Sequence, residues 1–93
     1  MIKTFACKET QGIFNGKASR KLPGDIQSRA RLVLVQIDSA TSVDQLRVPP
    51  SNRLKTLKGT RTPIWSVRIN DQWRVIFRWD SGQAFDVEIT DYH

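Results

Sequence analysis

Residues 65–89 read WSVRINDQWRVIFRWDSGQAFDVEI, and this stretch decides the fold. Apolar and polar side chains alternate along it three times, over 65–69, 73–79 and 85–89. A period of two is typical of a β-strand with one buried face and one solvent face. The stretch therefore predicts an antiparallel meander of three strands. One face of this sheet is apolar and needs a covering layer.

The same pattern predicts the register of the last two strands. The predicted opposite pairs are Trp79 with Phe85, Phe77 with Val87, and Val75 with Ile89. This register requires an odd-length loop, most simply 81–83. A shift of one residue would turn every side chain over, so the register also places Arg68, Arg74 and Arg78 on the open polar face. Three tryptophans then fall on the covered face, where core packing is favoured over base stacking: Trp65, Trp73 and Trp79.

The first half of the chain predicts the covering layer. Residues 2–6 favour a short strand, and 8–14 a weak helix that Gly16 can end. Asp25 is predicted to cap a stronger helix. The apolar positions of that helix recur at helical spacing: Ile26, Ala30, Val33 and Ile37.

Two further segments complete the predicted layer. Ser42 and Gln45 have the spacing of a capping box, which opens one more helical turn, and 49–52 is predicted to be an extended loop. The predicted fold class is α+β. We expect one compact domain spanning residues 1–93, with an N-terminal strand and two to three helices packed on one face of an antiparallel β-sheet.

The composition restricts the class of function. The chain has 93 residues, of which 39% are hydrophobic and 26% charged, values typical of one folded domain. With one cysteine, Cys7, and one histidine, His93, neither an internal disulfide nor a metal site is expected, and no cofactor is expected. No run of apolar residues is long enough to span a membrane. We expect a cytoplasmic protein without membrane contact.

Charge gives the first indication of a partner. Fifteen Lys and Arg against nine Asp and Glu give a net charge of +6, and residues 47–78 hold eight of the basic residues and one acid. Such a block favours a polyanion, nucleic acid before membrane, although a merely solvated basic surface would have the same composition. A cross-strand ion pair between Arg78 and Asp86 is the structural alternative for one of these arginines. The candidates for binding phosphate or substrate are Arg53, Lys55, Arg61, Arg68 and Arg78.

Candidate catalytic groups follow the last predicted strand. Polar residues at a chain end are usually frayed, but Asp91, Tyr92 and His93 would lie at the rim of the arginine-bearing face, beside Lys55 and Lys58. An acid, a phenol, an imidazole and two ammonium groups are sufficient for metal-free RNA cleavage. One group takes the proton of a ribose 2′-OH, cations stabilise the phosphorane, and an acid protonates the leaving 5′-oxygen.

An ordered set of motifs now resembles the HigB-type toxins of the RelE/ParE superfamily, over the whole chain. The matching stretches are Met1-Ile2-Lys3-x-Phe5, Leu54-x-x-Leu57-Lys58-Gly59-x-Arg61, Trp65-Ser66-x-x-Ile69, Trp73-Arg74-Val75-x-Phe77 and Asp91-Tyr92-His93. The resemblance implies a RelE-like fold and a toxin of a type II toxin–antitoxin system. It also implies a ribosome-dependent endoribonuclease, an mRNA interferase that cleaves mRNA in the ribosomal A site by metal-independent 2′-OH attack and inhibits translation.

The resemblance further implies partners and residue roles. The partners would be a helix-turn-helix, HigA-like antitoxin, the ribosome and mRNA, with operator DNA bound only through the antitoxin complex. Lys58 and Arg74 resemble the family's phosphate-contacting cations. The catalytic group would be completed by the C-terminal residues Asp91, Tyr92 and His93.

The assignment of acid and base stays open, and so do two other functions. Lys55 stands where related toxins can have a histidine, and lysine is a good phosphate clamp but a poor base at neutral pH. One alternative function is a ParE-like, gyrase-inhibiting toxin without nuclease activity. The other is a non-catalytic RNA- or DNA-binding module, for which the basic face would suffice.

Overall fold

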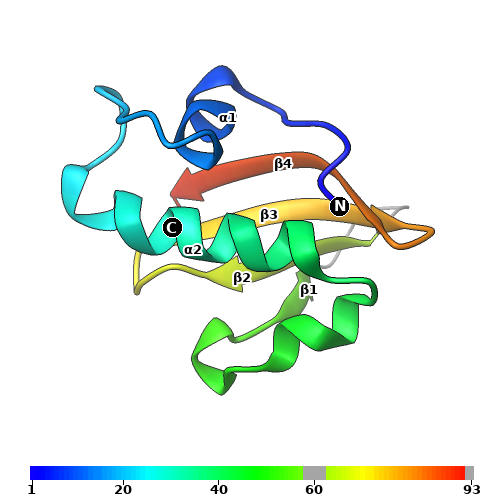
Figure 1. Ribbon diagram of the computed structural model, residues 1–93. Helices are drawn as coiled ribbons and strands as arrows, with labels where there is room; N and C mark the ends of the chain where they lie inside the picture. The colour runs from blue at the N-terminus through cyan, green and yellow to red at the C-terminus, as the bar shows by residue number, and fades with distance from the viewer. Residues whose placement is uncertain (58–62, 92–93) are drawn as a thin grey trace.

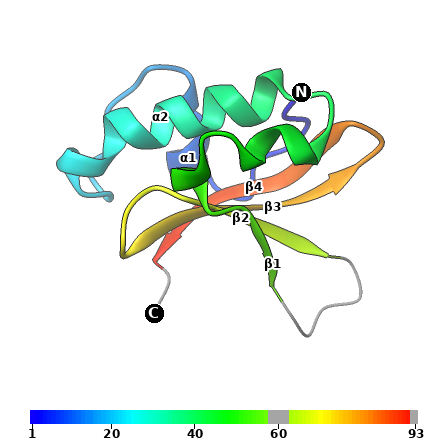
Figure 2. The same cartoon turned by 90° about the horizontal axis from the view of Figure 1, so that it is seen from below.

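Two helices pack on one face of a four-stranded sheet. The computed structural model describes residues 1–57 and 63–91. The elements in chain order are α1 (Lys8–Phe14), α2 (Gly24–Ser39), the 3-10 turns η1 (Val43–Arg47) and η2 (Pro50–Asn52), and the strands β1 (Lys55–Leu57), β2 (Ile64–Arg68), β3 (Trp73–Asp80) and β4 (Gln83–Asp91). The strands are antiparallel, in the order β1-β2-β3-β4. Both helices lie on one side of the sheet (Figures 1 and 2), which confirms the predicted α+β architecture.

The core lies between the helices and the sheet. The four predicted positions of α2 are all at most 3% exposed, and Leu34 joins them. The strands contribute apolar side chains from the same face: Val67, Val75, Phe77, Ala84, Val87 and Ile89. The three tryptophans are partly buried against this core, as predicted. No helix in the described part of the chain is long and apolar enough to cross a membrane.

The helices begin and end close to the predicted residues, with two differences. Gly16 follows α1 with φ 87°, a conformation that glycine adopts without steric cost. Helix α2 begins at Gly24 after Pro23, so Asp25 lies in its first turn instead of capping it. There its carboxylate still favours the positive end of the helix dipole. The segment predicted as an extended loop contains η2, because the buried Asn52 side chain donates to the carbonyls of Leu46 and Val48 and folds the chain back.

The N-terminal segment runs along the outer edge of β4. The predicted strand 2–6 is present only as two isolated parallel bridges, Ile2 with Ala84 and Phe5 with Val87. Between them the backbone N–H of Asp86 donates to the Thr4 hydroxyl at 2.8 Å. The segment covers backbone groups of β4 that an edge strand would otherwise expose.

The β3–β4 hairpin has the predicted register only in its inner half. The observed pairs include Val75 with Ile89, Arg78 with Phe85, and Trp79 with Ala84, and the register shifts between Ile76 and Arg78. The loop is the two-residue turn Ser81–Gly82, with φ of 52° and 80°, and not the predicted three-residue loop. Two successive positive φ values are the requirement of a type I′ hairpin turn. The predicted pairing of Trp79 with Phe85 is therefore wrong.

A β-bulge at Asp86 reconciles this turn with the core. Next to the two-residue turn, Trp79 pairs with Ala84. This pairing is shifted by one residue from the pairing of Val75 with Ile89 in the inner half of the hairpin. One additional residue in β4 absorbs the difference, and Asp86 has φ 54° there. As a result Ala84 takes a core position, and Phe85 lies opposite Arg78. In β3, Val75 and Phe77 point toward the helices, so Arg78 and Phe85 face the other way, as predicted for Arg78.

Candidate active site

Three rows of side chains cross the face of the sheet that the helices leave open. Residues paired across antiparallel strands have their side chains on the same face. The pairing gives the rows Leu57–Ile64–Arg78–Phe85, Lys55–Ser66–Ile76–Glu88 and Arg68–Arg74–Thr90. The open face is therefore a mixture of basic, apolar and hydroxyl side chains with one acid, Glu88, and not the uniformly polar face that the alternation predicted.

Arg74 is almost fully enclosed within this face. Its exposed fraction is 7%. Its Nε donates to the hydroxyl of Ser66, and its Nη2 donates to the backbone carbonyl of Arg53 at 2.8 Å. Because a guanidinium is planar, two donors held by fixed acceptors fix the orientation of the whole group. Arg74 is thus a positioned cation, and not the exposed one that strand alternation alone would suggest.

The Arg53 carbonyl is brought to Arg74 by a folded connection. Arg53 follows η2 with φ 45° and ψ 52°. Before it, the buried Asn52 donates to Gln36 Oε1 of α2 and to the Leu46 carbonyl, both at 3.1 Å. These bonds anchor the start of β1 to the helix layer. Because these bonds fix the backbone just before Arg53, the Arg53 carbonyl meets Arg74 Nη2 while the Arg53 side chain is exposed.

Lys55 lies next to this arrangement. It is exposed in β1 and pairs with Ser66, the same residue whose hydroxyl accepts from Arg74. The sequence predicted phosphate binding by Lys55 from the basic block, and by Arg74 from the family resemblance. The structure places both residues around one buried serine.

The two other described arginines of the face have carboxylate partners. Arg68 pairs with Asp71, and Arg78 Nε donates to Asp86 Oδ2 at 2.8 Å. The ion pair predicted as an alternative for Arg78 is therefore confirmed. Exposed pairs of this kind contribute only about 0.2–1 kcal/mol, so a polyanion can compete with them. Arg78 also places its Cζ 5.5 Å from the centroid of the Phe85 ring.

The described chain ends beside the row that contains Arg74. Asp91 is exposed and pairs with Trp73, so its side chain leaves the strand on the side of Trp73, and not on the arginine-bearing face as predicted. Gln72 Nε2 donates to Asp91 Oδ2 at 3.0 Å. The preceding residue, Thr90, lies opposite Arg74. The remaining candidates lie outside the described residues, and their roles stay predictions: Lys58, Arg61, Tyr92 and His93.

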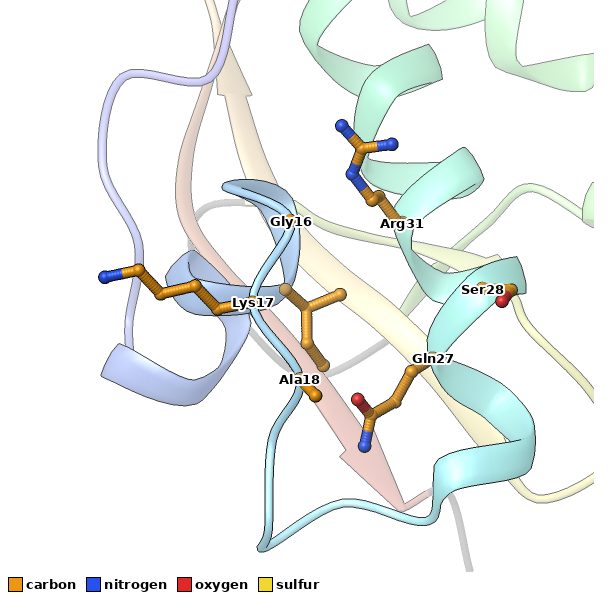
Figure 3. Close-up of a pocket in the computed structure, with 7 residues that line it drawn as sticks. Gly16, Lys17, Ala18, Gln27, Ser28 and Arg31 are labelled. Atoms are coloured by element: carbon orange, nitrogen blue, oxygen red, sulfur yellow. The ribbon is translucent and has the colours of Figure 1, made fainter.

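The helix side of the molecule has hollows of its own. One of about 190 Å³ lies between the end of α1 and α2 and is lined by residues that include Lys17, Gln27 and Arg31. Figure 3 shows the Lys17 side chain directed away from Gln27 and Arg31, so the two cations do not converge. In residues 1–57 and 63–91 no group of three His, Cys, Asp or Glu side chains is placed to hold a metal ion.

Two features of the site were missed by the sequence interpretation. Ser66 was part of a matching motif but received no role, because a serine on the solvent face of a strand is unremarkable. Phe85 was assigned to the core, although the Ser81-Gly82 dipeptide is a signal for a two-residue hairpin turn. That turn would have predicted the shifted register.

Comparisons with known proteins agree with this geometry. The model of the HigB-like toxins, RelE-like toxins of type II toxin–antitoxin systems, matches residues 3–93. The chain belongs to this family. It is 31% identical over 93 residues, the full length of both proteins, to endoribonuclease HigB of Proteus vulgaris. It is 36% identical over 70 residues to toxin HigB-1 of Vibrio cholerae, covering 75% of this chain and 74% of that toxin. The predicted family is confirmed, and a toxin of a type II system implies an antitoxin partner.

Proposed function

We propose that this HigB-like toxin is a ribosome-dependent endoribonuclease, an mRNA interferase that cleaves mRNA in the ribosomal A site. The observation that carries the proposal is the positioning of Arg74 by Ser66 and the Arg53 carbonyl, next to Lys55 and to the row where β4 ends. The full-length similarity to a protein named as an endoribonuclease supports it.

The proposed chemistry is metal-independent transesterification. The ribose 2′-oxygen attacks the adjacent phosphorus, the new O2′–P bond forms, and the P–O5′ bond breaks to leave a 2′,3′-cyclic phosphate and a 5′-OH. A base takes the 2′-OH proton, and an acid supplies a proton to O5′. Asp91, Tyr92 and His93 are the proposed acid–base group.

Cations stabilise the charge that develops on the phosphorane. A cation that is already oriented does so without reorganising during the reaction, and the guanidinium of Arg74, which Ser66 and the Arg53 carbonyl hold in place, meets that condition. We assign this role to Arg74 and Lys58. Binding of the RNA substrate is assigned to Arg53, Lys55, Arg61, Arg68 and Arg78.

Substrate presentation is assigned to the ribosome. A domain of 93 residues offers few groups that orient a flexible RNA by itself, and holding reactants in place accounts for a large part of enzymatic rate enhancement. The partners in this proposal are the ribosome, its mRNA and a HigA-like helix-turn-helix antitoxin. Operator DNA would be bound only through the antitoxin complex.

The test is cleavage by purified protein with and without ribosomes. We expect 5′-end mapping to find cuts within the A-site codon of programmed ribosomes, insensitive to a chelator, and little cutting of the same RNA when it is free. Arg74→Ala should suppress the cuts. Equal cleavage of free RNA would contradict ribosome dependence, and inhibition of gyrase without RNA cleavage would support the ParE-like alternative.

A further inference from the structure

The bulge at Asp86 turns an aromatic side chain out of the core. The alternation of β4 would bury Phe85 with Val87 and Ile89, but Ala84 takes that position and is fully buried. Phe85 is instead half-buried on the open face, opposite Arg78. Bulges often re-aim a side chain beside a functional site. Here the re-aimed residue is a phenylalanine on the same face as Lys55 and Arg74.

Arg78 and Phe85 together form a braced platform. The guanidinium carbon of Arg78 lies 5.5 Å from the ring centroid, and Arg78 Nε donates to Asp86 Oδ2 at 2.8 Å. The backbone of Asp86 is held in turn by the Thr4 hydroxyl. Asp86, the bulge residue, therefore positions both the Arg78 guanidinium and the Phe85 ring. The row continues with two apolar side chains, those of Ile64 and Leu57.

The chemistry of this platform favours a nucleobase over a phosphate. The charge of Arg78 is already matched by Asp86, so the pair lacks the excess of positive charge that suits a phosphate. An aromatic ring and a planar guanidinium are the two groups on which unpaired bases of RNA stack. Stacking also does not require the guanidinium to leave its carboxylate.

We propose that Phe85 and Arg78 form a nucleobase subsite, in which one unpaired base of RNA stacks on the ring–guanidinium platform. The proposal deepens the proposed function and rests on it for the identity of the RNA. Phe85 pairs with Arg78 and Asp91 with Trp73, five residues apart along β3, which is roughly 17 Å at the rise of an extended strand. The bound base is therefore remote from the cleaved bond, and belongs either to the mRNA or to the ribosomal RNA.

The experiment measures affinity separately from cleavage. A programmed ribosome carries a 2′-O-methyl nucleotide at the cut position, which removes the nucleophile, and the dissociation constant of the protein is measured. Phe85→Leu should weaken binding about 5- to 150-fold, the usual contribution of one stacked base. Phe85→Trp, which keeps an aromatic face, should bind within about threefold of the wild type.

Two further variants control the interpretation. Phe14→Leu alters a partly buried aromatic residue of α1, which packs on Phe5 with ring centroids 5.6 Å apart on the helix side, and should leave affinity unchanged. Arg78→Lys keeps the positive charge but replaces the planar guanidinium with an ammonium group, and should therefore weaken binding. This variant tests the subsite independently if Phe85→Leu folds poorly. An affinity unchanged in both Phe85→Leu and Arg78→Lys would overturn the subsite. Equal losses in Phe85→Leu and Phe85→Trp would also overturn it, because stacking requires only an aromatic face.

The source of the base is resolved in the same assay. A loss that persists on ribosomes without mRNA assigns the base to ribosomal RNA, and a loss that an abasic nucleotide in the message abolishes assigns it to mRNA. Both results support the subsite. If the wild type binds as expected but cleaves no message, the subsite stands and the proposed nuclease function fails.

Discussion

Ser66→Ala removes the hydroxyl that accepts a hydrogen bond from Arg74 Nε. Ser66 is fully buried and Arg74 is 7% exposed, so bulk water does not readily replace that acceptor. A hydrogen bond to a charged group contributes about 1.5–3 kcal/mol, and we expect the free energy of unfolding to fall by a similar amount. The guanidinium would keep the Arg53 carbonyl as an acceptor but lose the contact that fixes its plane.

The effect on cleavage follows from that loss of orientation. Removing a preorganised donor costs on the order of 10²–10³ in rate, which is the loss expected for Arg74→Ala. Ser66→Ala leaves the cation present but misplaced, so its loss should be smaller, about 10- to 100-fold. Affinity for programmed ribosomes should change little, because neither buried group offers much surface for docking.

A double-mutant cycle checks whether Ser66 acts through Arg74. Single-turnover rates at saturating protein are measured for Ser66→Ala, Arg74→Ala and the double variant, at a temperature where all three are folded. If the serine works by holding the arginine, adding Ser66→Ala to the Arg74→Ala protein should change the rate less than about twofold. Losses that multiply instead would refute the reasoning and leave Ser66 a purely structural residue.

Three other predictions concern the chain end, the basic surface and the hairpin. Deleting His93 should leave the melting temperature unchanged and slow single-turnover cleavage by roughly 10²–10⁴; a rate within threefold of the full chain would remove His93 from the mechanism. Arg20→Ala, an exposed arginine in the connection before α2, should leave single-turnover cleavage unchanged while Arg74→Ala loses it, and equal losses would indicate a diffuse basic surface. Gly82→Ala should destabilise the protein by about 1 kcal/mol, since Gly82 has φ 80°, a left-handed conformation that a residue with a Cβ adopts only with strain. A calorimetric melting temperature lowered by several degrees would confirm it.

The layers of the fold could be predicted because they depend on periodicity. Period-two alternation identified β2 and β3, and the helical spacing of Ile26, Ala30, Val33 and Ile37 identified the buried side of α2. The outer half of the hairpin could not be predicted from hydrophobicity, because that criterion prefers phenylalanine to alanine in the core. The backbone preference of Ser81–Gly82 decided the register instead.

For the candidate site, the sequence predicted on which face of the sheet the arginines lie, but not which contacts enclose Arg74. Alternation gives the face to which Arg74 belongs, but it does not show that Ser66 and the Arg53 carbonyl enclose the guanidinium. That enclosure depends on a connection folded by the buried Asn52, and its bonds to Gln36 and Leu46 join residues from separate elements. Local sequence patterns do not encode such contacts.

The first ten residues of the chain form hydrogen bonds with β4, which is the last strand to be synthesised. Lys3 N–H donates to the Ala84 carbonyl at 2.7 Å, Ala6 N–H to the Val87 carbonyl at 3.0 Å, and Ile89 N–H to the Thr10 hydroxyl at 3.0 Å. The loop-closure entropy of contacts between residues so far apart in sequence must be paid before they stabilise the fold. Translation must therefore pass residue 89 before the first ten residues gain these partners, and until then the outer edge of β4 is not covered.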